Sequence, residues 1–126
     1  MGRVRRRGED GDWSGVTPAG YAGGAERHTV IGRADGATQI ELRYFRMPSG
    51  TASARERHAH EHTIVVLEGT AEIQLGSETH LVRPGDAVFV AAAETHRISS
   101  VGEDPLGFLC TAPVARRRGA EGLLGD

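Results

Sequence analysis

The chain has 126 residues, 38% of them hydrophobic and 25% charged, which predicts a single globular domain with a modest core. Its formal net charge of −2 argues against nucleic acid or an anionic membrane surface as the main partner. Cys110 is the only cysteine, which excludes an internal disulfide, and no apolar run reaches the length of a membrane span. We therefore expect a cytoplasmic domain with no nucleic-acid or membrane partner.

Residues 1–22 predict a flexible N-terminal tail followed by an arm. Residues 1–12 (MGRVRRRGEDGD) offer almost nothing to bury, so we expect them to be disordered and solvated. The arginines of residues 5–7 are soon followed by acidic residues, which favours a solvated charge run over a binding site. Residues 13–21 (WSGVTPAGY) are loop-like but include aromatic side chains, so we expect an irregular arm packed on the domain or on a partner subunit.

From His28 onward the chain predicts short strands separated by turns. Within residues 38–47 the side chains alternate, with Leu42 and Tyr44 on one face and Glu41 and Arg43 on the other. Further strands are expected at residues 63–68, 70–75, 78–82, 87–91, 96–101 and 106–110.

No segment has a capped helical period, and residues 120–124 (AEGLL) are the only weak helix candidate. Short strands at regular turn spacing predict an all-β fold, a single antiparallel β-barrel or jelly-roll sandwich. We expect this barrel to span residues 23–113 and a C-terminal tail to span residues 114–126.

The side chains most suited to chemistry are concentrated in residues 50–69 (GTASARERHAHEHTIVVLEG). On one straight strand His58, His60 and His62 would share a face but stand ~6.5 Å apart, so the outer pair would span ~13 Å. Imidazole nitrogens bind a metal at ~2.1 Å, so three in a row on an extended strand cannot meet at one ion. A mononuclear site therefore needs a bend between His58 and His62 and a ligand from elsewhere, for which His96 is the candidate.

This stretch resembles the first motif of the cupins, G-x5-H-x-H-x3,4-E-x6-G. Its spacing is matched throughout by Gly50, Glu56, His58, His62 and Gly69. Two residue types are exchanged, because Glu56 stands where the motif has its first histidine and His62 stands where it has its glutamate.

The second cupin motif, G-x5-P-x-G-x2-H-x3-N, is matched in spacing from Gly85 to Ser100. The glycine and the histidine, His96, are present, while Ala91, Ala93 and Ser100 replace the proline, the second glycine and the asparagine. The resemblance covers roughly residues 38–112. Its pattern looks most like the small four-histidine manganese cupins of the RmlC-like group, from which Glu56 departs.

The resemblance implies a metal held by Glu56, His58, His62 and His96. Such a mixture of imidazole and carboxylate suits divalent Mn, Fe, Ni, Zn or Co, with Mn or Fe favoured, and excludes a soft Cu(I) site. His60 and Glu61 then fall in the bend and are the candidates for proton transfer. His60 is also a replacement ligand if Glu56 turns away.

The sequence leaves the roles of several other residues open. His28 and His80 are expected to be surface or core residues, and Cys110 an ordinary buried thiol, with a role near the substrate as the alternative. A pocket could be lined by Arg43, Tyr44 and Phe108.

For function, the resemblance implies a metal-dependent enzyme acting on a small oxygenated organic molecule, with dioxygenase-type oxidation favoured. The alternatives are a non-redox Lewis-acid isomerase, cyclase or decarboxylase, and a non-catalytic cupin that binds a small molecule. A homodimer is expected, because cupins of this size are commonly dimers.

Overall fold

The computed structural model describes residues 2–114, where strands are the main regular structure. Single-turn 3-10 helices occur at Ala22–Gly24 (η1) and Arg33–Asp35 (η2). The strands are β1 (Ala19–Gly20), β2 (Glu26–Ile31), β3 (Ile40–Met47), β4 (His62–Glu68), β5 (Ala71–Leu75), β6 (Glu78–Val82), β7 (Ala87–Val90), β8 (His96–Ser100) and β9 (Leu106–Pro113). The predicted all-β fold is confirmed.

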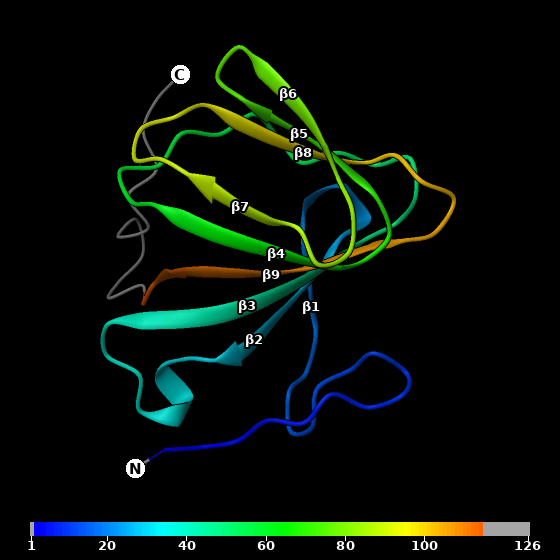
Figure 1. Cartoon of the computed structure of the whole chain (residues 1–126). Coiled ribbons are helices and arrows are strands. Elements are labelled where there is room, and N and C mark those ends of the chain that lie inside the picture. Colours follow the sequence, from blue (N-terminus) through cyan, green and yellow to red (C-terminus); the bar gives the residue numbers. More distant parts are fainter. Residues whose placement is uncertain (1, 115–126) are drawn as a thin grey trace.

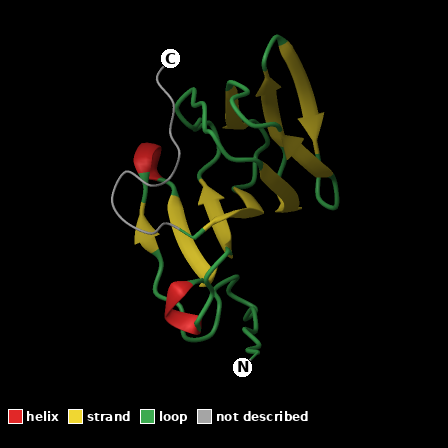
Figure 2. Cartoon of the chain, turned by 90° about the vertical axis from the view of Figure 1, so that its left-hand side faces the viewer, coloured by secondary structure: helices red, strands yellow, loops and turns green. Residues whose placement is uncertain are grey.

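The strands form two sheets that face each other (Figures 1 and 2). The large sheet has the order β1-β2-β3-β9-β4-β7, and the small sheet has the order β6-β5-β8. Single bridges from Ala52 to Ser99 and from Glu56 to His96 lay residues 51–56 beside β8, where they extend the small sheet. The pairings are antiparallel, as a jelly-roll barrel requires.

The strand register decides which side chains enter the barrel. Residues directly opposite each other on paired antiparallel strands lie on the same face of a sheet. On β3 and β9, Phe45 stands opposite Phe108 and Arg43 opposite Cys110. Phe108 and Cys110 belong to the core between the sheets, so the inner face of β3 carries Arg43 and Phe45. Tyr44 lies on the outer face of the same strand.

Gly69 joins β4 to β5 and shows why the first motif ends in glycine. Its φ of +79° lies in the left-handed region, which side chains with a Cβ rarely adopt. A Cβ there would also collide with the backbone of Pro105 and Leu106. The glycine is therefore required both by the turn and by the close approach of the loop before β9.

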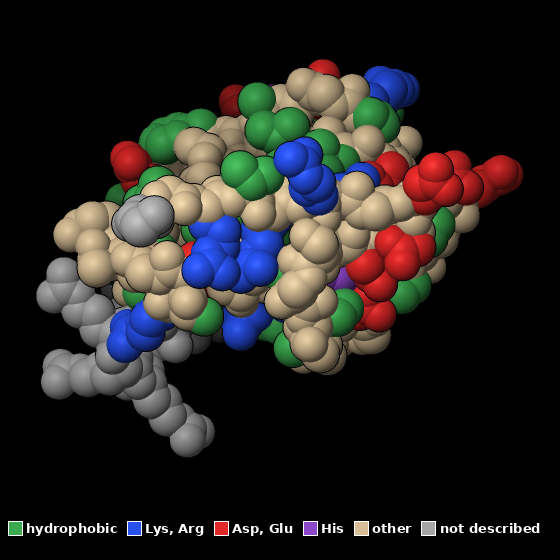
Figure 3. All heavy atoms as spheres, turned by 90° about the horizontal axis from the view of Figure 1, so that it is seen from below, with side chains coloured by type: hydrophobic (Ala, Val, Ile, Leu, Met, Phe, Trp, Pro, Cys, Tyr) green, Lys and Arg blue, Asp and Glu red, His purple; other side chains and the backbone are tan. Residues whose placement is uncertain are grey.

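The N-terminal segment differs from the disordered tail that the sequence predicts. Figure 3 shows this lower face of the molecule, where arginine side chains gather in the middle and acidic side chains at one end. This segment is held on the domain by arginines that pair with carboxylates of η2 and β4. Arg5 pairs with Asp35, and Arg7 pairs with Glu68 and donates a 2.7 Å hydrogen bond to the Tyr44 hydroxyl.

The arm of residues 13–21 packs on the domain, wrapping the edge of the large sheet. Trp13 packs against Tyr44 on the outer face, with ring centroids 6.1 Å apart. Tyr21 packs edge-on against Phe45 on the inner face at 5.4 Å. The arm thus contacts both sides of the same sheet.

The predicted C-terminal tail lies almost wholly outside the described residues, as does the weak helix candidate at residues 120–124. The domain boundaries at residues 22/23 and 113/114 stay a prediction. Within residues 2–114, no helix has the length and apolar character needed to cross a membrane.

Candidate metal centre

Three histidines from separate parts of the chain meet inside the barrel. His62 is the first residue of β4, His96 is the first residue of β8, and His58 lies in the segment that leads into β4. One ligand atom from each lies within 4.8 Å of the others. Opposite ligands of an ion with bonds of ~2.1 Å stand ~4.2 Å apart, so shifts of about half an ångström would let these atoms share one metal.

The bend that this geometry needs is present. Ala59 and His60 form a bend, and β4 begins only at His62. The bend turns His58 back, so its ring centroid lies 5.1 Å from that of His62 and 5.2 Å from that of His96. His58, His60 and His62 therefore do not lie on one straight strand, and the bend lies where the sequence argument requires it.

Two of the imidazoles are fixed in orientation by backbone carbonyls. The Nδ1 atom of His62 lies 3.1 Å from the carbonyl oxygen of Thr111, and the Nδ1 of His96 lies 3.1 Å from that of Glu94. Because a carbonyl only accepts, each Nδ1 carries the proton and donates it, and each Nε2 keeps a free lone pair. Histidine ligands of metals show this arrangement, in which the second ring nitrogen is held by a hydrogen bond.

Glu56 completes the group of donors. It forms a backbone pair with His96, with hydrogen bonds of 3.0 Å and 2.9 Å, so the two side chains point to the same face. Its Oε2 accepts a 2.8 Å hydrogen bond from the Nε2 of His58. Adjacent ligands at ~2.1 Å from an octahedral ion stand ~3.0 Å apart, so this separation fits two ligands of one ion. The residues present therefore fit a divalent metal.

His60 lies beside the cluster, and Glu61 does not contact it. The His60 ring stacks on His58 with centroids 5.0 Å apart and meets His62 edge-on at 4.7 Å. Glu61 is exposed, and the structure records no polar contact for it within residues 2–114. Of the two predicted proton carriers, His60 is the one that lies next to the candidate ligands.

Burial lowers the pKa of three of the histidines at or beside the cluster. It lowers the pKa of His62 to about 4 and also lowers the pKa of His58 and of His60. For His58 the neighbouring Glu56 carboxylate opposes this effect but does not cancel it. These shifts favour the neutral imidazole of His58, His60 and His62, and the neutral imidazole is the form that binds a metal ion.

Cys110 lies next to the cluster as a neutral thiol. Its Sγ is 3.4 Å from the Nδ1 of His62, on the far side of the ring from the free Nε2. Burial raises the pKa of the thiol to about 12. Because the thiolate is the form that binds metals, Cys110 is not one of the candidate ligands in this arrangement.

The three residues that the sequence suggested for a pocket lie on different faces of the large sheet. Phe108 is a core residue stacked on Phe45 at 5.3 Å, and Tyr44 is buried on the outer face. Only Arg43 both faces inward and is polar. The sequence alternation assigned Arg43 to one face, but only the strand register shows that this face is the interior.

A surface hollow of about 200 Å³ lies away from the histidines, between the N-terminal segment and β2. Its lining includes Arg5, Arg27 and Asp35, and it contains no histidine. The candidate metal centre is therefore identified by its converging donor atoms and not by the shape of a cavity.

A jelly-roll barrel with an interior cluster of imidazoles and one carboxylate defines a class of metal-binding β-proteins. The chain belongs to the cupin family, since the model of the cupin domain matches residues 43–112. The match includes all three clustered histidines and Glu56.

Solved structures agree with this assignment. A cupin 2 conserved barrel domain protein from Rhodopseudomonas palustris is 31% identical with a TM-score of 0.79, over 92% of this chain and 83% of its own. The polyketide cyclase RemF from Streptomyces resistomycificus is 27% identical with a TM-score of 0.75, over 90% of this chain and 79% of its own.

Among curated proteins, 1-methylthio-D-xylulose 5-phosphate methylsulfurylase from Rhodospirillum rubrum is 34% identical over 76 residues. These residues are 60% of this chain and 49% of that protein. The chain spans about half the length of the curated relatives that it matches.

Proposed function

We propose that the chain is a metal-dependent enzyme that acts on a small oxygenated organic molecule. The observation that carries this proposal is the convergence of His58, His62 and His96 with the Glu56 carboxylate inside the barrel. Four protein ligands leave up to two positions of an octahedral ion open for substrate. Named enzymes among the similar proteins, a methylsulfurylase and a polyketide cyclase, support catalysis over binding alone.

Each residue has a proposed part. Glu56, His58, His62 and His96 hold the ion, which is Mn or Fe by preference and otherwise Ni, Zn or Co. A bound ion of this kind supplies Lewis acidity toward substrate oxygens. The carbonyl oxygens of Thr111 and Glu94 orient the rings of His62 and His96. His60, stacked on His58 with a lowered pKa, accepts or donates the substrate proton, and the exposed Glu61 is the weaker candidate.

Elemental analysis of protein purified without chelators tests the proposal. We expect close to one divalent metal per chain in the wild type and a large loss in His58→Ala. His80→Ala is the matched control, because His80 is exposed on β6 and the one polar partner recorded for its side chain among the described residues is Glu78. Less than about a tenth of a metal per chain in the wild type, unaltered by His58→Ala, would contradict the proposal.

Within this proposal, dioxygenase-type oxidation is the reaction that the motif resemblance favours. A second candidate is a non-redox reaction such as cyclisation, favoured by the similarity to RemF over 90% of this chain. The two differ in their need for O₂. Oxygen uptake by the metal-loaded protein in the presence of enolisable acids and ketones supports the oxidation, whereas turnover that is unchanged under anaerobic conditions supports the second candidate.

A further inference from the structure

A charged pair occupies the inner face of β3, where an apolar residue would otherwise be expected. Further along the same face, Phe45 and Met47 pack into the core. At the other end, the Nε of Arg43 donates a 2.9 Å hydrogen bond to the Oε2 of Glu41. Both side chains are largely buried, with 16% and 10% of their surface exposed.

Stability does not account for this pair. Removing two charges from water costs several kcal/mol each, and an apolar pair of similar volume is often as stable or more stable. The neighbouring Phe45 and Met47 show that this face accepts apolar residues. A charged pair at such a position indicates a function beyond holding the strand in place.

Arg43 lies next to the candidate metal centre. It stands opposite Cys110 in the β3–β9 register, and the Cys110 sulfur is 3.4 Å from His62. Burial is the main cause of the lowered pKa of His58 and of His60, and the positive charge of Arg43 is a smaller cause in the same direction. The guanidinium therefore acts on the cluster from the wall formed by β3 and β9.

The hydrogen bonds of Arg43 leave one edge of the guanidinium available. Glu41 accepts from Nε, and no partner for the two terminal nitrogens is recorded within residues 2–114. Two parallel N–H groups of arginine match the two oxygens of a carboxylate or a phosphate. Arg97 differs, because it is exposed next to His96 and its Nε donates to the carbonyl of Ser53.

We propose that Arg43 binds an anionic group of the substrate, a carboxylate or a phosphate monoester, beside the metal centre. Glu41 is the positioning residue that holds the guanidinium by its Nε. The free edge of the guanidinium supplies the attraction for the anion, and a divalent ion held by Glu56 and the histidines would add to that attraction. This inference deepens the proposed function, because it assigns a substrate class to the same site.

Calorimetric titration with inorganic phosphate and with malonate tests the assignment, using wild type, Arg43→Gln and Arg97→Gln. We expect at least one of the two anions to bind the wild type, and Arg43→Gln to weaken that binding at least ~10-fold, since hydrogen bonds to charged groups are lost. Arg97→Gln removes the same charge from the outside of the barrel and should leave the affinity unchanged. Which anion binds more tightly distinguishes a phosphate from a carboxylate.

The metal content of the wild type and of Arg43→Gln separates this inference from the proposed function. Arg43→Gln should retain the wild-type metal content, because Arg43 is not a ligand. A wild type without metal would contradict the proposed function, while Arg43-dependent anion binding would still stand. If Arg43→Gln does not fold, the double variant Glu41→Gln/Arg43→Gln is used in its place, because it leaves neither charge of the pair without its partner. Equal anion affinity in the folded variant and the wild type, or no binding of either anion at millimolar concentration, would overturn the assignment of Arg43.

Discussion

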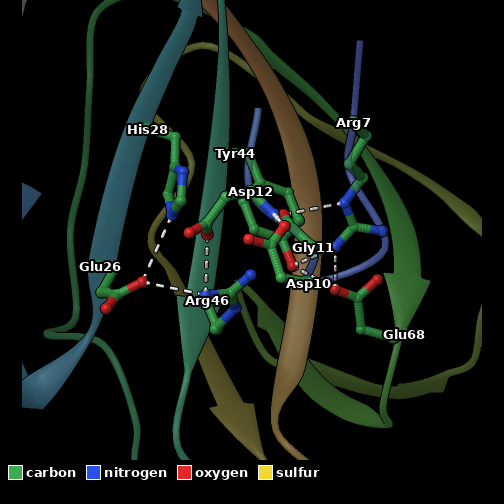
Figure 4. Close-up of polar contacts among 9 residues, drawn as sticks. All are labelled: Arg7, Asp10, Gly11, Asp12, Glu26, His28, Tyr44, Arg46 and Glu68. Atoms are coloured by element: carbon green, nitrogen blue, oxygen red, sulfur yellow. Dashed lines mark hydrogen bonds and ion pairs between the residues drawn. The ribbon is translucent and has the colours of Figure 1, made fainter. Parts of the chain in front are cut away.

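One cluster of polar side chains lies on the outer face of the large sheet and another lies between the two sheets, and the two clusters differ in where their polar atoms point. On the outer face the charges are paired with one another, as Figure 4 shows. Arg7 contacts both Glu68 and the Tyr44 hydroxyl, and Arg46 lies 3.2 Å from Glu26 and 3.3 Å from Asp12.

Gly107 makes room for this outer network. A Cβ at this position of β9 would collide with the Glu68 carboxylate and the Tyr44 hydroxyl. Two buried nitrogens, Nε1 of Trp13 and Nδ1 of His28, have no recorded partner among the described residues. They do not converge with other donors, so they do not form a site.

Between the two sheets the donor atoms converge on one another instead. One ring nitrogen from each of His58, His62 and His96 lies close to the others, and the Nδ1 of His58 has no recorded partner within residues 2–114. Buried polar groups are nearly always satisfied, so a group of converging lone pairs indicates a ligand. The comparison separates a network that holds the fold together from a cluster arranged to bind an ion.

The largest effect is expected for His62→Ala. Loss of a partner outside the ligand shell costs ~10- to 100-fold in metal affinity, so loss of a direct ligand should cost more than ~100-fold. Competition with a chromophoric chelator measures this. The matched variant on the outer face, Arg7→Ala, should bind metal as the wild type does. Equal metal affinity in His62→Ala and the wild type would remove the distinction between the faces.

A smaller loss is expected for Glu56→Gln. The amide keeps the shape of the side chain but loses the charge that balances the ion, so metal affinity should fall ~10- to 100-fold. Glu68→Gln is the control, because it makes the same change on the outer face. An unchanged affinity in Glu56→Gln would show that Glu56 is not a ligand and would favour His60 in its place.

Most of the barrel could be predicted from the sequence because strands and turns are local signals. The alternation around Tyr44 and the glycines that end each run predict strands close to those observed, with β3 at Ile40–Met47 and β4 at His62–Glu68. The bend between His58 and His62 followed from the length of an extended strand alone. These features depend on residues that are neighbours in the chain.

Features that join distant parts of the chain were missed. The contact of Arg7 with Glu68 places a tail that looked solvated against the sheet. Composition cannot show this, because the partner carboxylate is 61 residues away in sequence. The inward direction of Arg43 was missed for the same reason, since it depends on the pairing of β3 with β9.

The outer network should affect stability and leave metal binding unchanged. Tyr44→Phe removes a buried hydroxyl that contacts both Arg7 and Glu68, so unfolding free energy should fall by about 1 kcal/mol. Urea denaturation measures the loss, and elemental analysis checks that the metal content is unaltered. Metal loss in Tyr44→Phe would mean that the two faces are coupled through β3.

The smallest effect is the acid dependence of the Glu68 contact. Burial alone would raise the pKa of Glu68, but the hydrogen bonds from Arg7 and Tyr44 outweigh it and lower the pKa below its usual 4.5. A carboxyl group with a lower pKa in the folded state contributes stability above its unfolded pKa, and this contribution is lost as the pH falls through the folded value. Wild type should therefore exceed Glu68→Gln in unfolding free energy at pH 6, by less than about 1 kcal/mol because the pair is partly exposed. The difference should shrink as the pH falls below 4.5. Urea denaturation of the metal-free proteins across this range measures it without a contribution from metal release, and a difference that does not change with pH would show that the contact does not depend on the charge of Glu68.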